Sequence, residues 1–100
     1  MKENRMVVGV CHISLIIHES HSLKQKRQVL KSVMEKVKNR FNVSVAEVGS
    51  NDAWQRAEIG LSVVGNDRAF VNSSLDKVMN FVEDLHLAEI AGHEIELINC

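Results

Sequence analysis

The chain has 100 residues, of which 45% are hydrophobic and 25% are charged, and this is the composition of one soluble globular domain. No apolar run is long enough to span a bilayer, and the first residues do not have the form of a secretory signal. We therefore expect a cytoplasmic protein with no membrane partner. Cys11 and Cys100 form no CxxC pair or Cys/His cluster, so we expect neither a structural disulfide nor a metal site.

The formal net charge of −1 conceals an uneven distribution. Residues 22–41 contain seven basic residues and one acid, a balance of +6, whereas the rest contains five basic residues and twelve acids, a balance of −7. Total charge therefore argues against general polyanion binding. The distribution leaves one basic segment as a candidate surface for nucleic acid.

The first predicted elements are a strand and a long amphipathic helix. Met6–Ile17 is rich in Val and Ile and has the pattern of a central strand. Ser22 is a typical N-cap, and Gln25 three residues later completes a capping box. The helix that follows has an apolar stripe on one face. This stripe comprises Leu23, Leu30, Met34, Val37 and Phe41.

Two alternating segments, Asn42–Gly49 and Trp54–Gly65, predict a β-hairpin with turn residues at 50–52. Asn66 and Asp67 then predict the cap of a second amphipathic helix. A last alternating strand is predicted at residues 93–98, with Gly92 before it as a break or bulge. The apolar stripe of the second helix comprises Val71, Leu75, Val78, Met79, Val82 and Leu85.

This order of elements predicts a single α+β domain over residues 1–100, in which residues 1–5 form a flexible tail. Two amphipathic helices must each bury one stripe, and a βαββαβ chain does this as a ferredoxin-like plait. We expect a four-stranded antiparallel sheet with both helices on one face. Right-handed crossovers place the first and third strands in its centre.

Four basic side chains cluster on one flank of the first helix, beside its apolar stripe. They are Lys24, Arg27, Lys31 and Lys38. Three interpretations stay open. The cluster is a solubilising face, a ridge that follows nucleic-acid phosphates, or a surface for an acidic partner, such as the strand of a second copy that carries Glu94 and Glu96.

A plait leaves one sheet face without helices, and RNA-recognition folds place stacking aromatics there. None of the aromatic residues in this chain falls in the middle of a predicted strand, and the outward positions are mixed polar. We therefore expect no base stacking on the sheet. The open face is instead a candidate surface for a homodimer.

The predicted hairpin contains the residues with the clearest alternatives. Trp54 is either an anchor for a partner at an exposed tip or a ring that folds back over one end of the core. Arg56 either opposes a phosphate or carboxylate of a partner, or pairs with Asp52 or Glu47 of the same chain.

No catalytic constellation is visible in the sequence. His18 and His21 flank Glu19, but no serine or cysteine nucleophile or second carboxylate accompanies them. P-loop, dinucleotide and nucleophile-elbow motifs are absent. We therefore expect no enzyme and no cofactor, and a small hydrolase or transferase is the alternative.

Three segments of the chain resemble the YlxP-like family, small bacterial proteins of unknown function. They are "SLKQKRQVLKSVMEKVKNRFNVSVAEVG", "DAWQRAEIGLSVVGND" and "LDKVMNFVE". The resemblance implies a ferredoxin-like plait. Genes of the family often lie beside those for transcription elongation, translation initiation and ribosome maturation factors, which implies by association a role near RNA or the ribosome. The family has no established catalytic residues to transfer.

Two functional hypotheses result. In the first, a non-enzymatic protein binds RNA or ribosomal particles through the four basic side chains of the first helix, with Arg56 and Trp54 contributing at the hairpin. In the alternative, the protein is an interaction or homodimerisation module that uses the open sheet face and Trp54.

Overall fold

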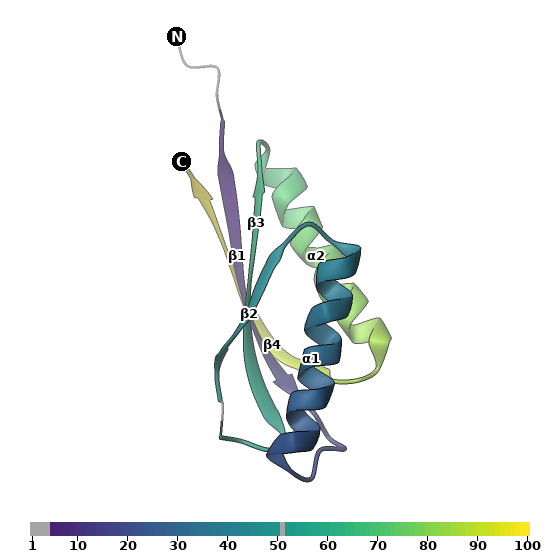
Figure 1. Cartoon of the computed structure of the whole chain (residues 1–100). Coiled ribbons are helices and arrows are strands. Elements are labelled where there is room, and N and C mark those ends of the chain that lie inside the picture. The colour runs from purple at the N-terminus through teal and green to yellow at the C-terminus, as the bar shows by residue number, and fades with distance from the viewer. Residues whose placement is uncertain (1–4, 51) are drawn as a thin grey trace.

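A computed structural model describes residues 5–50 and 52–100. The elements are β1 (Val7–Ile16), α1 (Leu23–Arg40), β2 (Ser44–Gly49), β3 (Arg56–Gly65), α2 (Arg68–Leu85) and β4 (Glu89–Asn99). Both helices run along one side of the sheet (Figure 1). The predicted α+β ferredoxin-like plait is confirmed. Of the expected flexible tail, residues 1–4 lie outside the described part.

The sheet is antiparallel, with the strand order β2-β3-β1-β4 and the predicted first and third strands in the centre. Its register shifts at two places. One shift lies between Glu47 and Gly49 on β2, and the other lies opposite Ser14 and Leu15 of β1, where β4 passes Gly92. Of the break or bulge predicted at Gly92, the bulge is confirmed. β4 begins four residues earlier than the predicted strand, because the chain before the bulge also pairs with β1.

Side-chain caps determine where the two helices begin. The Ser22 hydroxyl accepts a hydrogen bond from the Gln25 backbone at 3.1 Å, and the Gln25 side chain accepts one from the His21 backbone at 2.6 Å. The Asp67 carboxylate accepts from the Phe70 backbone at 2.9 Å. These bonds satisfy amide groups that have no partner within the helix, as the capping patterns predict.

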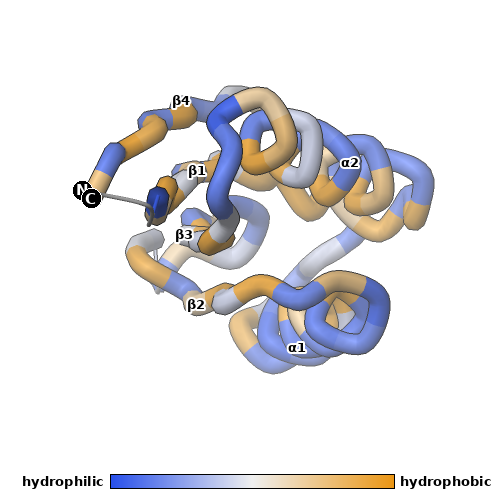
Figure 2. Tube along the Cα trace, turned by 90° about the horizontal axis from the view of Figure 1, so that it is seen from above, coloured by the Kyte–Doolittle hydropathy of each residue, from blue (hydrophilic) through white to orange (hydrophobic). Residues whose placement is uncertain are grey.

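The two helices lie side by side over one face of the sheet (Figure 2). The core lies between them and the sheet, where the apolar stripes predicted for both helices meet the inward side chains of the strands. α2 packs across β1, β3 and β4, and α1 packs beside it over β2. Alternate residues of the two central strands are buried here. They are Cys11, Ile13 and Leu15 on β1 and Ala57, Ile59, Leu61 and Val63 on β3.

Gly9 allows α2 to approach the sheet closely. A Cβ atom at this position would lie 2.5 Å from Val71 Cγ1 and 2.9 Å from Leu75 Cδ1, both on α2. Carbon atoms do not approach so closely without displacement of one group. The absence of a side chain at Gly9 therefore sets the distance between this helix and the central strand.

Candidate nucleic-acid interface

The basic side chains predicted to share a flank of α1 are all exposed. Lys24, Lys31 and Lys38 recur at seven-residue spacing, so they lie on the same side of the helix. Within the described residues none of the three forms an ion pair. Arg27 differs from them, because its guanidinium lies 3.6 Å from Glu47 Oε1 on β2. We call Lys24, Arg27, Lys31 and Lys38 the α1 row, of which one member is partly neutralised.

The connection between β2 and β3 lies at the end of the molecule where α1 begins (Figure 1), and Trp54 belongs to this connection. The Trp54 side chain is 56% exposed, so it does not close one end of the core. Arg56 is also exposed. Its expected pairing with Asp52 or Glu47 is wrong, since no ion pair of Arg56 occurs in the described part of the chain and Glu47 faces α1 instead.

Lys26 holds this connection from beneath. Its side chain is fully buried, and its ammonium donates to the backbone oxygens of Ser50 at 2.8 Å and Arg56 at 3.3 Å. The two ends of the connection are thereby fastened to the first turn of α1. Ser50 has a φ of 59°, in the left-handed region, which the sequence pattern predicted as turn-forming.

Glu47 supplies the negative charge beside this buried cation. Its Oε2 atom lies 3.9 Å from Lys26 Nζ and is buried without a hydrogen-bond partner among the described residues. Oε1 of the same carboxylate faces Arg27. A buried ammonium is costly unless it is paired and hydrogen-bonded, and Glu47 together with the backbone carbonyls meets this need.

Gln55 provides a second attachment, to the segment before α1. Its side-chain amide donates to the backbone oxygens of His18 at 3.3 Å and Ser20 at 3.1 Å. The Ile17 amide donates to the Gln55 backbone oxygen at 2.8 Å. The connection that carries Trp54 is therefore bonded both to α1 and to the segment that leads into it.

Sequence reasoning missed the part that Lys26 plays. It placed this lysine nearer the apolar face than the other basic residues of the helix but gave it no role. Residues 23, 26, 30, 33 and 37 follow one helical stripe, and all but residue 26 are apolar. A charged residue within such a stripe is the signal that was available. Its partners on the β2–β3 connection could not be inferred, because they depend on the path of the chain at residues 50–56.

The open sheet face is mixed polar, as the outward positions of the strands predicted. His12, Ser14 and Glu58 form a polar cluster on it, with His12 Nε2 at 2.9 Å and Ser14 Oγ at 2.6 Å from Glu58 Oε1. Beyond this cluster the outward side chains are mixed. The polar ones are Ser44, Arg56, Ser62, Glu94 and Glu96. The apolar ones include Val8, Val10, Ala46, Val48, Val64 and Ile98, of which Val48 and Val64 are 58% and 63% exposed.

Other classes of site find no support in the described residues. They contain no group of three or more His, Cys, Asp or Glu side chains placed to hold a metal ion. His18, which was considered for acid–base chemistry, is exposed and pairs with Glu89 on β4 at 2.6 Å. Neither helix in this part of the chain has the apolar length needed to cross a membrane.

The structure is thus a ferredoxin-like α+β domain with a basic first helix and an exposed tryptophan on the β2–β3 connection. Residues 8–95 match the family described as protein of unknown function (DUF503). The chain is 38% identical over 77 residues to the uncharacterised protein YlxP of Bacillus subtilis (strain 168), which covers 77% of this chain and 84% of that protein. The chain belongs to this family.

Among solved structures, the de novo designed protein Foldit4 is similar over 97% of each chain, with a TM-score of 0.46 and 16% sequence identity.

Proposed function

We propose that this protein is a non-enzymatic, cytoplasmic RNA- or ribosome-associated protein that binds single-stranded RNA at the end where α1 begins. The observation that carries the proposal is the exposed Trp54, on a connection that Lys26 bonds to the first turn of α1, the turn that also carries Lys24. Proteins that bind single strands combine an aromatic platform for bases with cations that follow the phosphates.

In this arrangement Trp54 stacks on one base, and Lys24 and Arg56 contact the adjacent phosphates. The row then continues along α1 to Lys31 and Lys38. At a rise of about 1.5 Å per residue, the distance along the helix from Lys24 to Lys38 is roughly 21 Å, which is enough for several nucleotides. Arg27 contributes less than the lysines, because Glu47 already opposes its charge.

The bonds that hold the connection favour a binding site that is already in place before the RNA arrives. A Trp with more than half of its surface exposed contributes little to the stability of the fold. The buried polar groups beneath it, by contrast, stabilise the fold only when all of them are hydrogen-bonded. Holding such a ring in one position reduces the entropy lost when a base stacks on it.

The salt dependence of RNA binding tests this proposal. A fluorescein-labelled twelve-nucleotide oligouridine is titrated with wild type and with the variant K24A/K31A at increasing salt. Each lost phosphate contact on a single strand lowers the slope of log K against log salt by about 0.7, so the variant should lose about 1.4. The control K36A/K77A removes two lysines outside the row and should keep the wild-type slope.

Equal slopes for wild type and both variants contradict binding through the row. An equal decrease of the slope in K24A/K31A and K36A/K77A would mean that only the total charge of the protein matters, and this result also contradicts binding through the row. A nearly salt-independent affinity of wild type would exclude phosphate contacts altogether.

A second candidate function is protein interaction through the open sheet face, with either another protein or a second copy and with Trp54 as an added anchor. The observation in its favour is the exposed apolar surface around Val48 and Val64. Sedimentation equilibrium tests the homodimer. A dimer that V48R dissociates supports it, and a monomer at high micromolar concentration contradicts it.

A further inference from the structure

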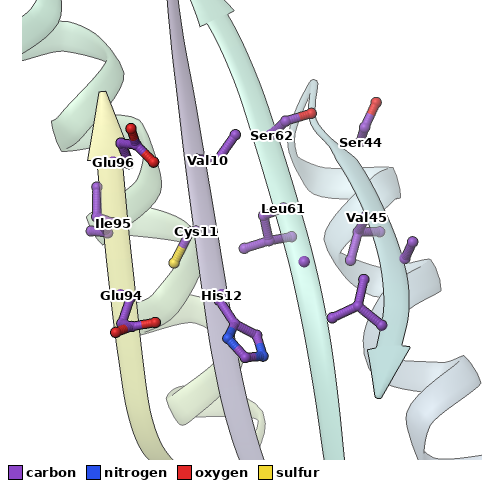
Figure 3. A pocket seen from close by; sticks show the side chains of 13 residues that line it. Val10, Cys11, His12, Ser44, Val45, Leu61, Ser62, Glu94, Ile95 and Glu96 are labelled. Atoms are coloured by element: carbon purple, nitrogen blue, oxygen red, sulfur yellow. The ribbon is translucent and has the colours of Figure 1, made fainter. Parts of the chain in front are cut away.

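The open sheet face carries a groove of about 710 Å³. Figure 3 shows Glu94 and Glu96 of β4 along one side, Ser44 of β2 along the other, and Val10 and His12 of β1 between them. Its size is within the range of natural ligand sites, and its centre is apolar. The groove is distinct from the α1 row, which lies on the helix side of the sheet.

Small residues create the hollow. Gly60 of β3 pairs directly with Ala46 of β2 and with His12 of β1, so two adjacent positions in the middle of the face carry almost no side chain. Val48 rises beside them, since its Cγ1 atom would lie 3.2 Å from a Cβ atom on Gly60. The result is an apolar floor with taller side chains around it.

The charges around this floor are of one sign. Glu94 and Glu96 are exposed and form no ion pair or side-chain hydrogen bond within residues 5–50 and 52–100. Glu58 is already bonded by His12 and Ser14. The two free carboxylates beside an apolar floor therefore favour a partner that is both apolar and cationic.

A helix fits this floor better than a strand does. The groove lies on the face of the sheet, and the backbone groups of β1 and β3 beneath it are already used in the ladder. An added strand would find no partners for its own amides there, whereas a helix satisfies its backbone internally. The opposite face of the same sheet already receives two amphipathic helices.

We infer that the groove on the open sheet face binds a basic amphipathic helix of another protein, with apolar side chains over Gly60 and Ala46 and cations at Glu94 and Glu96. The inference rests on the second candidate function and is independent of RNA binding. A second copy fits less well, because the groove is lined by Glu94 and Glu96 and by no lysine or arginine, so two facing grooves would bring four carboxylates together.

The test uses a fluorescein-labelled 18-residue peptide of leucine and lysine, with the leucines at helical spacing. Binding to the full chain is followed by fluorescence anisotropy at moderate salt. E94Q/E96Q should weaken binding about fivefold, as expected for the loss of exposed ion pairs. The control E83Q/D84N makes the same change of charge on α2 and should stay within twofold of wild type.

A46R supplies a second variant, because it puts a bulky cation into the floor while changing an exposed edge-strand residue. It should weaken peptide binding more than tenfold, whereas N80R on α2 should have no effect. RNA binding should be unchanged by E94Q/E96Q, and peptide binding should be unchanged by K24A/K31A. A failure of one proposal can therefore be distinguished from a failure of the other.

Equal peptide affinities for wild type, E94Q/E96Q and A46R overturn the inference. Equal affinity for a peptide of the same composition with alternating leucines also overturns it, because that peptide has no apolar helical face. A wild-type dimer that A46R dissociates assigns the face to a second copy, which keeps the second candidate function and overturns the helix partner.

Discussion

The α1 row on the helix side of the sheet and the groove on its open side present charges of opposite sign. On the helix side the ammonium of Lys26 is buried and bonded to backbone oxygens, while the lysines of the α1 row project into solvent. On the open side the groove is lined by the exposed carboxylates Glu94 and Glu96 beside a hollow apolar floor.

This difference teaches that a net charge near zero says little about the partners of a small domain. A chain with a formal charge of −1 presents a cationic surface and an acidic groove on separate sides. Each attracts a different class of partner, because electrostatic attraction depends on the local distribution of charge.

The largest expected effect is on the helix side, from Lys26→Met. The change leaves two backbone oxygens and the buried carboxylate of Glu47 without their cation, so unfolding free energy should fall by about 3 kcal/mol. Urea denaturation measures the loss, and K77M on the exposed side of α2 should change stability by less than about 0.5 kcal/mol. Similar stability of the two variants would mean that Lys26 does not hold the connection.

The same substitution, glycine to alanine, tests the packing of the helix side at Gly9 and of the open side at Gly60. Alanine at residue 9 forces α2 away from the sheet and should lower the free energy of unfolding by about 1–3 kcal/mol. Alanine at residue 60 meets only the exposed side chain of Val48 and should have an effect within about 0.5 kcal/mol. Equal destabilisation in denaturant melts would contradict the difference in packing.

Trp54→Ala tests the exposed ring without disturbing the core. Loss of a stacking platform should weaken binding of the twelve-nucleotide oligouridine by about 1–3 kcal/mol, while thermal stability stays close to wild type. F70A removes another exposed ring, in the first turn of α2, and should leave RNA affinity unchanged. An RNA affinity equally reduced in both variants would speak against a specific platform.

The smallest expected effect is a difference in thiol reactivity between the buried Cys11 and the exposed Cys100. Burial, together with the charge of Asp76, raises the pKa of the Cys11 thiol above its ordinary value of 9.0, whereas Cys100 is exposed. At pH 8 a thiol reagent should label one cysteine in the folded protein and two in denaturant. Because the folded pKa is raised, the contribution of Cys11 to stability is present below the ordinary pKa and is lost as pH rises through the folded value.

Rapid labelling of both thiols in the native protein would show that β1 opens easily at Cys11.

The sequence predicted those parts of the fold that depend on local pattern. The caps at Ser22 and Asp67 and the apolar stripes follow from the spacing of side chains, and the order of elements then allows few topologies. The earlier start of β4 was missed because it depends on a bulge opposite β1. A bulge is a property of pairing and leaves only a weak trace in one strand.

The candidate sites were predicted less completely. Exposure of the α1 row follows from helix periodicity, but the contact of Arg27 with Glu47 depends on how α1 lies over β2. The groove was missed for a similar reason. Gly60 and Ala46 become a hollow only when the register places them side by side, and the sequence does not contain that register.

The intrinsic fluorescence of Trp54 tests the central claim most directly, because it is the only tryptophan of the chain. The unlabelled wild-type protein is titrated with the twelve-nucleotide oligouridine at low salt, and emission is followed to saturation. A base stacked on the ring should quench the emission, and added salt should restore it as the phosphates leave the α1 row. Binding that leaves the emission unchanged, or no binding at low salt, would contradict the proposed interface.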